Sequence, residues 1–334
     1  MTGTTKIVWR GLQVAFFAVG VLIVAMLLFN PPLGLYLLWD VLIPVAPLLL
    51  VLAPGLWRNV CPLGSFSLLP AQLGLSRGRT ISQAWQQRLL LGAIVLLLVI
   101  VPLRHVVLDV YGVVTGIVLL VVAAAAIGLG FVFDWKSAWC SGLCPVYPVE
   151  MLYGSRPLVS VPNVQCRVCT GCVSPCRDSS RALVPPDAAK GGSKLLVYLF
   201  AGGFPGFVLG WYLVSPNTSA PLLEQIGMAF LLPMAGLLAS ALLFLGLYLA
   251  FPRRRRWLAL LFAALAVAIY YWFKLPVMLG LEGDGTHALL NLRAVLPGWS
   301  VWALRVGAGA LLFGLMLGRK PSAGWSGRVA SATA

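Results

Sequence analysis

The sequence predicts an all-α membrane protein with about eight transmembrane helices, and three observations lead to that prediction. Hydrophobic residues make up 60% of the 334-residue chain, charged residues only 10%, and the mean hydropathy is +0.95. Soluble domains carry about 25% charged residues, so a soluble fold is excluded. A hydrocarbon core of about 30 Å needs roughly 20 apolar residues per helix, and runs of that length recur along the chain.

Eight apolar runs have the length of a membrane span. The first run lacks a clear small-residue cleavage site and is longer than the hydrophobic region of a secretory signal peptide, so we expect an uncleaved span. Pro44, Pro47 and Pro54 interrupt the second run and predict a bent or broken helix. The eight runs are Val8–Phe29, Leu35–Leu56, Leu89–Val106, Val113–Phe133, Leu195–Leu213, Ile226–Phe251, Leu258–Leu279 and Val301–Leu317.

The distribution of Lys and Arg predicts that both chain termini are cytoplasmic. If the first span starts inside, only Arg104, Lys274, Arg293 and Arg305 of the 24 basic residues lie near the outer side. Basic residues favour the cytoplasmic side, so we expect an N-in, C-in topology in a bacterial inner membrane. The net charge of +15 then reflects this rule and contact with anionic lipid, and nucleic-acid binding is not expected.

The spans and loops divide the chain into three predicted parts. Residues 1–134 form an N-terminal half with four spans and a first inner loop at residues 57–88. Residues 135–194 are predicted to form a cytoplasmic loop domain, which contains six of the seven cysteines. Residues 195–334 form a C-terminal half with four spans and no cysteine. A scaffold, a partner surface and a quinone pocket are all compatible with this last part.

Four of the seven cysteines form a run with ferredoxin spacing. The run contains Cys166, Cys169, Cys172 and Cys176 and reads C-x2-C-x2-C-x3-C. In bacterial ferredoxins, three closely spaced thiolates of such a run bind one [4Fe–4S] cluster, and the fourth ligates another cluster. Gly171 relieves crowding where the backbone must pass close to the cluster. The run therefore predicts cysteine-ligated iron–sulfur chemistry.

Disulfides and zinc are the other common uses of clustered cysteines. All seven cysteines are predicted at or beyond the cytoplasmic surface, and this reducing compartment disfavours a disulfide framework. Structural zinc sites usually pair two C-x2-C knuckles that are a dozen or more residues apart. Zinc binding and free thiols remain the alternatives, and thiolate ligands at this spacing favour iron–sulfur.

The other three cysteines lie in two Cys-Pro sites that form a weak internal repeat. Cys61 precedes a proline after the second span, and Cys144 precedes a proline after the fourth, with Cys140 four residues earlier. Cys140 and Cys144 would share one face if the fourth helix continued that far. Because the ferredoxin run needs ligands from elsewhere, we expect all three to be ligands. The alternative is that they are small buried apolar residues.

Together these motifs resemble the membrane-bound polyferredoxin-like [4Fe–4S] proteins. That family includes the quinol dehydrogenase membrane subunit of periplasmic nitrate reductase systems, the regulator-type nitrous oxide reductase membrane protein and the accessory protein of cbb-type cytochrome oxidases. The resemblance covers about residues 35–181 and implies [4Fe–4S] electron transfer at the cytoplasmic face, coupled to a quinol pool or a periplasmic redox partner. The sequence departs from the family at Trp57, where another cysteine is usual, and at Arg177, where proline usually follows the run.

The departure at Trp57 leaves seven cysteines, whereas two clusters with four cysteines each need one more. Our working assignment gives Cys166, Cys169, Cys172 and one Cys-Pro cysteine to a first cluster. Cys176 and the remaining cysteines then hold a second cluster incompletely. One cluster is therefore expected, and a second is conditional on another ligand or a partner.

Several ionisable residues near the outer face are candidates for other chemistry. His105 and Asp109 suit the acid–base chemistry of quinol oxidation, and a pair of interface residues is the alternative. Lys274 lies in an aromatic belt, where snorkelling of its side chain toward the membrane surface explains a charged residue. The role of Asp40 is ambiguous in the same way, between a structural and a functional one. Haem is not expected, because the chain has no C-x-x-C-H motif and His105 and His287 are both predicted outside.

The leading functional expectation is an electron-transfer subunit of an oxidoreductase, such as a component of a quinol dehydrogenase. It would pass electrons between the quinone pool and a partner redox protein or membrane complex. One alternative is an accessory or maturation factor whose clusters reduce a metal or thiol during assembly of another enzyme. A second alternative is a membrane anchor whose cluster senses redox state.

Overall fold

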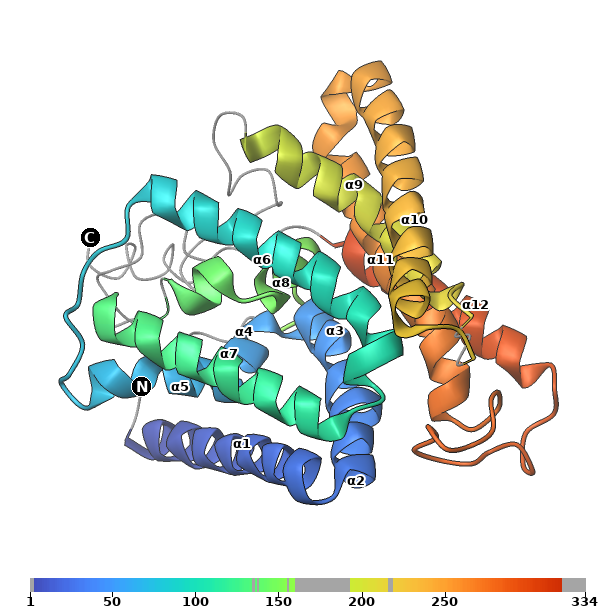
Figure 1. Ribbon diagram of the computed structural model, residues 1–334. Helices are drawn as coiled ribbons and strands as arrows, with labels where there is room; N and C mark the ends of the chain where they lie inside the picture. The colour runs from blue at the N-terminus through green and yellow to red at the C-terminus, as the bar shows by residue number, and fades with distance from the viewer. Residues whose placement is uncertain are drawn as a thin grey trace.

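The computed structural model describes residues 3–133, 136, 138–154, 156–159, 193–215 and 219–319, and these residues form an all-helical protein (Figure 1). Eight helical segments are long and apolar enough to cross a membrane, one for each predicted run. The prediction of a multi-pass helical protein is therefore confirmed. The eight segments are Ile7–Phe29, Pro31–Leu52, Ala84–Leu108, Gly112–Val132, Leu195–Tyr212, Leu222–Ala250, Pro252–Met278 and Ser300–Leu317.

The second span is interrupted as the prolines predict, but its ends differ from the prediction. It consists of α2 (Pro31–Tyr36), a π-helical segment (Leu37–Leu42) and α3 (Ile43–Leu52). Proline is favoured in the first helical turn, which explains the earlier start at Pro31. The span ends earlier because Ala53, with φ −151° and ψ 68°, breaks the helix before Pro54. A residue before proline is disfavoured in the helical region.

Two short helices and two further spans complete the N-terminal half. The first span is α1 (Gly3–Phe29), and the break at Ala53 is followed by α4 (Pro54–Val60) and α5 (Pro62–Gln72). The third span joins α6 (Gln83–Leu103) to a π-helical segment at Arg104–Leu108, and the fourth is α7 (Gly112–Val132). Helix α5 packs against α7 so closely that a Cβ on Gly130 would lie 2.3 Å from the Ser67 carbonyl oxygen.

The C-terminal half contains α9 (Ser193–Tyr212), α10 (Leu222–Ala250), α11 (Arg255–Met278) and α12 (Ser300–Leu317), with a short 3-10 turn at Pro252–Arg254. Helices α9 and α10 approach one another closely at positions where glycine leaves room for the neighbouring backbone. A Cβ on Gly206 would lie 2.0 Å from the Gly236 carbonyl oxygen, and one on Gly210 would lie 2.3 Å from that of Leu232. Small residues permit such close packing of helices in lipid.

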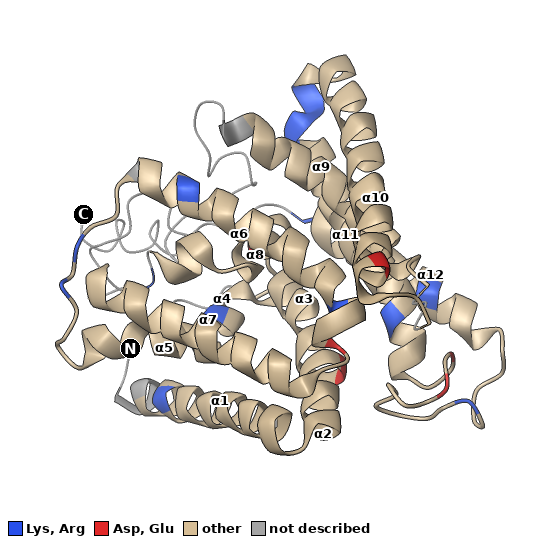
Figure 2. Ribbon diagram, viewed as in Figure 1, with Lys and Arg blue, Asp and Glu red and all other residues tan. Residues whose placement is uncertain are grey.

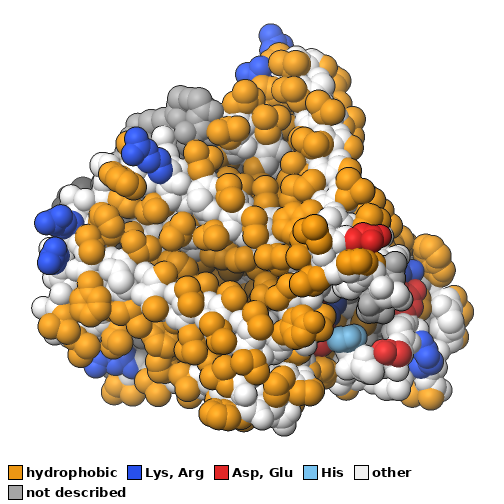
Figure 3. Space-filling view, viewed as in Figure 1, with side chains coloured by type: hydrophobic (Ala, Val, Ile, Leu, Met, Phe, Trp, Pro, Cys, Tyr) orange, Lys and Arg blue, Asp and Glu red, His pale blue; other side chains and the backbone are white. Residues whose placement is uncertain are grey.

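A short helix, α8 (Val146–Tyr153), lies between the two halves (Figure 1). Its Met151 and Leu152 side chains are fully buried in the largest apolar cluster, with Phe204 of α9 and Val267 of α11. The second Cys-Pro site is therefore held by a helix that packs against both halves. In contrast, the outward faces of the spans are covered by apolar side chains, as expected for contact with lipid (Figure 3).

Charged side chains are distributed unevenly between the two ends of the bundle (Figure 2). One end carries basic residues at the start of α1, between α5 and α6, at the start of α6 and at the junction of α10 and α11. The acidic residues visible in this view lie at the opposite end, in the second span, at the start of α10 and before α12. The basic group includes Arg10, Arg77, Arg79, Arg88 and Arg253–Arg256, and the acidic group is Asp40, Glu224, Glu282 and Asp284.

The close approach of α9 and α10 predicts that Gly206→Ala destabilises the protein. An added Cβ cannot fit beside the Gly236 carbonyl, so the helices must separate, which should cost about 1–3 kcal/mol. Gly246→Ala in α10 is the matched control, because no atom lies within 4 Å of its Cβ position. Thermal unfolding in detergent should show a lower midpoint for the first variant alone. Equal midpoints would contradict this packing.

Candidate functional site

Cys61 and Cys144 occupy equivalent positions in the two Cys-Pro sites. Cys61 has φ −57° and ψ 124°, and Cys144 has φ −61° and ψ 123°. Each cysteine ends one helical segment, and the proline after it opens the next: Pro62 begins α5, and Pro145 precedes α8. The repeat seen in the sequence therefore corresponds to a repeated local structure.

Both of these thiols lie at the N-terminus of a helix. Hydrogen bonds from the backbone amides of Leu63 and Gly64 favour the ionised form of Cys61, and one from the Val146 amide favours that of Cys144. The unpaired amides at a helix N-terminus stabilise negative charge. Both sulfurs are thus placed where a thiolate, or a metal-bound sulfur, gains hydrogen bonds from the main chain.

Cys140 is not placed by an extension of the fourth helix. Helix α7 ends at Val132, and the amides of Arg77 and Arg79 bond to the carbonyl oxygens of Phe131 and Val132 at its end, at 2.8 and 3.1 Å. Cys140 instead belongs to a separate π-helical segment, Trp139–Leu143, which is kinked at Ser141. The two cysteines therefore do not share a face of a continuous helix.

The two Cys-Pro sites nevertheless come together. A Cβ on Gly64 of α5 would lie 3.7 Å from both the Cys140 Sγ and the Cys61 Cβ, and the Ser67 hydroxyl lies 3.8 Å from the Cys140 Sγ. The thiols of Cys61 and Cys144 also each interact electrostatically with Cys140. The fold thus gathers three cysteines that are separated by up to 83 residues in sequence.

Burial favours the protonated thiols of Cys61 and Cys144 when no metal is bound. Burial raises the pKa of Cys61 to about 11 and raises that of Cys144 well above its usual value, and neighbouring cysteines add to both shifts. Within the described residues, no three Cys, His, Asp or Glu side chains are close enough to hold a single metal ion.

A buried polar network surrounds the three cysteines. The Arg58 guanidinium lies 3.3 Å from the Glu150 carboxylate and 2.9 Å from the Ser141 hydroxyl, and it donates to the Cys140 carbonyl oxygen. The Lys136 ammonium donates to the Arg58 carbonyl oxygen. Arg58, Lys136 and Glu150 are each no more than 5% exposed. None of the three was predicted as part of the site, although Arg58 lies within the first Cys-Pro motif, between Trp57 and Cys61.

Trp57 has a structural role at the position where the resemblance expects a cysteine. Its side chain packs against the main apolar cluster, as do those of Cys144 and Val146. The described part of the site therefore supplies three thiols and no fourth. The predicted ligands Cys166, Cys169, Cys172 and Cys176 lie outside the described residues.

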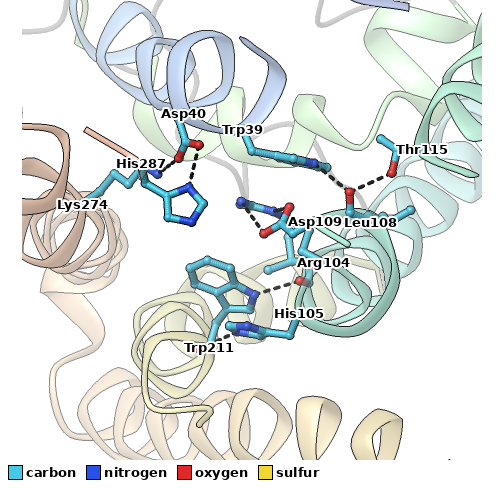
Figure 4. Close-up of polar contacts among 11 residues, drawn as sticks. Trp39, Asp40, Arg104, His105, Leu108, Asp109, Thr115, Trp211, Lys274 and His287 are labelled. Atoms are coloured by element: carbon cyan, nitrogen blue, oxygen red, sulfur yellow. Dashed lines mark hydrogen bonds and ion pairs between the residues drawn. The ribbon is translucent and has the colours of Figure 1, made fainter. Parts of the chain in front are cut away.

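The other predicted pair, His105 and Asp109, makes hydrogen bonds with other residues in the structure (Figure 4). The Asp109 carboxylate accepts two hydrogen bonds from Arg104, at 3.2 and 3.1 Å. The His105 ring stacks on Trp211 with 4.5 Å between centroids, and its Nε2 lies 2.9 Å from the Trp211 carbonyl oxygen. Arg104 is also held over the rings of Trp39 and Trp211. These contacts favour a structural role for the pair.

Asp40 connects the two halves at the same end of the bundle. Its carboxylate lies 2.7 Å from the Lys274 ammonium and 2.8 Å from His287 Nδ1, and it is 4% exposed (Figure 4). Asp40 lies in the second span, Lys274 in α11 and His287 in the loop before α12. Snorkelling was the sequence-based explanation for Lys274, and Asp40 was left ambiguous. The structure corrects this, because the two residues form a largely buried ion pair.

Comparison with models of known protein families, with curated proteins and with solved structures finds no match to this chain. The site is therefore interpreted from its own residues and geometry.

The Asp40 contacts predict that Asp40→Asn destabilises the protein. The substitution keeps the side-chain shape but leaves the Lys274 ammonium, which is largely buried, without a carboxylate, at a cost of about 3 kcal/mol. Asp284→Asn is the control, because that carboxylate is exposed and bonds to Thr286 within its own loop. The thermal midpoint should fall for Asp40→Asn alone. It should recover in part when Lys274→Met is added, because no unpaired charge then remains.

If Asp40→Asn unfolds at the wild-type temperature, the contact between the halves contributes no stability.

Proposed function

We propose that this chain is a membrane-bound [4Fe–4S] electron-transfer protein whose cysteine site faces the cytoplasm of a bacterial inner membrane. It would act as a subunit that relays electrons between the quinone pool and a partner redox protein. The observation that carries the proposal is the gathering of Cys61, Cys140 and Cys144 from two repeated Cys-Pro sites.

The donor set fits an iron–sulfur cluster better than other metal centres. Three thiols are soft ligands of the kind that such clusters use. Backbone amides at the starts of α5 and α8 point at two of the sulfurs. Hydrogen bonds to cluster sulfurs stabilise the negative charge that accumulates on reduction.

The grouping of these thiols favours one shared centre for both Cys-Pro sites, rather than the division in our working assignment. Further ligands are expected from the ferredoxin run between Cys166 and Cys176. The orientation rests on the charge distribution, since the described basic residues around the cysteine site lie at the end of the bundle away from most acidic residues (Figure 2).

When bound, a [4Fe–4S] cluster accepts and donates single electrons. The chain's own residues have supporting roles. Cys61, Cys140 and Cys144 supply ligands, while Trp57 and Cys144 pack against the apolar cluster that contains residues of α8. This packing excludes water from one side of the site, and it fixes the positions of the ligands. Low solvent exposure is one of the factors that set the reduction potential of such centres.

The proposal that the protein exchanges electrons with quinone rests on the family resemblance and not on a pocket in the described residues. His105 and Asp109 remain predictions for quinol chemistry, although both side chains are engaged by other residues. Because they lie at the far end of their spans from the cysteines, a periplasmic acceptor would need quinone or another subunit as a relay.

Iron and sulfide counting after anaerobic purification, combined with EPR spectroscopy, tests this function. We expect about eight irons per chain for two clusters, or about four for one. Cys61→Ser should lose iron and change the spectrum, because the shared centre loses a ligand. Ser65→Ala is the control, since that hydroxyl bonds only to the Cys61 carbonyl among its described contacts.

Wild-type protein without iron or acid-labile sulfide would refute the proposal. Iron content and spectra that are unchanged in Cys61→Ser would remove Cys61 from the ligand set. Reduction of the centre by quinol in native membranes would support the quinone connection specifically.

A further inference from the structure

The loop between α5 and α6 and the start of α6 present a basic and aromatic surface. We call it the α5–α6 surface and define it by six exposed side chains. These are Leu73, Leu75, Arg77, Arg79, Trp85 and Arg88. The Arg88 guanidinium lies 5.3 Å from the centroid of the Trp85 ring. Figure 2 shows the basic residues of this loop at the margin of the molecule, where a partner can reach them.

The backbone beneath this surface is held in place. The amides of Arg77 and Arg79 bond to carbonyl oxygens at the end of α7, at 2.8 and 3.1 Å. Gly78, between the two arginines, has a φ of 59°, which glycine adopts without strain. Ile81, two residues after Arg79, is buried. Because the loop is already ordered, a partner that binds it does not have to order it first, and this preorganisation favours affinity.

The α5–α6 surface lies next to the cysteine site. Helix α5, which leads into the loop, begins directly after Cys61. At the start of α6, Gln86 donates from its Nε2 to the Ser141 carbonyl oxygen at 3.2 Å, and Ser141 follows Cys140. Both helices that flank the surface are therefore connected to the cysteine site. Electron transfer slows steeply with the distance between donor and acceptor, so a redox partner bound here is well placed.

The composition of the surface favours an acidic protein as the partner. Arg and Trp are enriched at the centres of protein interfaces, whereas Lys is depleted there. The surface has three arginines and no lysine, and residues 41–108 of the sequence contain no Asp or Glu. The parts of the chain outside the described ranges contain six Lys or Arg and three Asp or Glu. Their own charge is thus also positive, so as a whole they do not neutralise the surface.

We infer that the α5–α6 surface docks an acidic electron-transfer protein and so brings the redox centre of that protein toward the cysteine site. The inference rests on the proposed function, since it needs a centre at the cysteines that exchanges electrons. One electron leaves the reduced partner, which is oxidised, and reduces the centre held by the cysteines. A positive docking surface raises the association rate of an acidic partner, and salt weakens this effect.

Reduction of the purified, iron-loaded protein by a small acidic ferredoxin, itself reduced beforehand, tests the docking surface. The protein is placed in nanodiscs of phosphatidylcholine, so that anionic lipid does not compete, and stopped-flow absorbance follows the reaction. We expect the second-order rate constant to fall as the salt concentration rises. In the Arg77→Gln/Arg79→Gln variant, the rate constant at low salt should be about tenfold lower and should depend less on salt.

Arg253→Gln/Arg254→Gln is the matched control, because it removes the same charge from exposed residues at the turn between α10 and α11. It should retain the wild-type rate constant, and iron content and EPR spectra should be the same in all three proteins. Equal losses of rate in both double variants would show that only net charge matters and would overturn the inference. Loss of iron from Arg77→Gln/Arg79→Gln would indicate a structural role and overturn it as well.

Anionic lipid is the competing occupant of this surface. If Arg77→Gln/Arg79→Gln retains less phosphatidylglycerol through purification but is reduced at the wild-type rate, the surface contacts lipid head groups and the inference is wrong.

The two proposals fail in different ways. Wild-type protein that binds no iron refutes the proposed function, and the inference falls with it. Wild-type protein with a cysteine-dependent centre that the ferredoxin does not reduce, or reduces independently of Arg77 and Arg79, refutes only the inference.

Discussion

The contact between the two Cys-Pro sites is the interaction on which the candidate function depends. Arg58 and Lys136 make it with buried hydrogen bonds between main chain and side chain. In an interior of low dielectric constant, such bonds are strong when complete and costly when broken. They place three cysteines from separate helices at one end of the bundle. The packing of α8 against both halves then fixes that arrangement within the membrane protein.

The opposite end of the bundle uses buried charge differently. Asp40, Lys274 and His287 contact one another, and Arg104 is held by Asp109 and two indole rings. Positive and negative groups are matched here, so these contacts suit a structural connection between the halves. At the cysteine end, Arg58 and Lys136 instead donate to main-chain carbonyl oxygens, and these bonds join the two Cys-Pro sites.

The spans could be predicted from sequence because each requires only a local apolar run. The ends of the second span could not, because they depend on how Pro31 and Pro54 are accommodated. The repeat of Cys61 and Cys144 was visible in the sequence, and its local geometry agrees with that pattern. A shared face for Cys140 and Cys144 was predicted only if the fourth helix continued that far, and α7 ends at Val132.

The polar partners of the site could not be predicted, because they depend on tertiary contacts. Arg58 and Glu150 are 92 residues apart, and Asp40 and Lys274 are 234 residues apart. Neither pair has a characteristic spacing in the sequence. These charges matter because they are buried. Their burial becomes known only when the packing of the helices is known. The ferredoxin run remains a prediction from its spacing, because it lies outside the described residues.

The central claim is that both Cys-Pro sites serve one metal centre. The most direct measurement is the iron content of Cys61→Ser, Cys144→Ser and the double variant, all prepared anaerobically. Residues that act as one unit show non-additive effects. We therefore predict that the double variant loses no more iron than either single variant. Losses that add together would show that the two cysteines bind separate centres and would contradict the account.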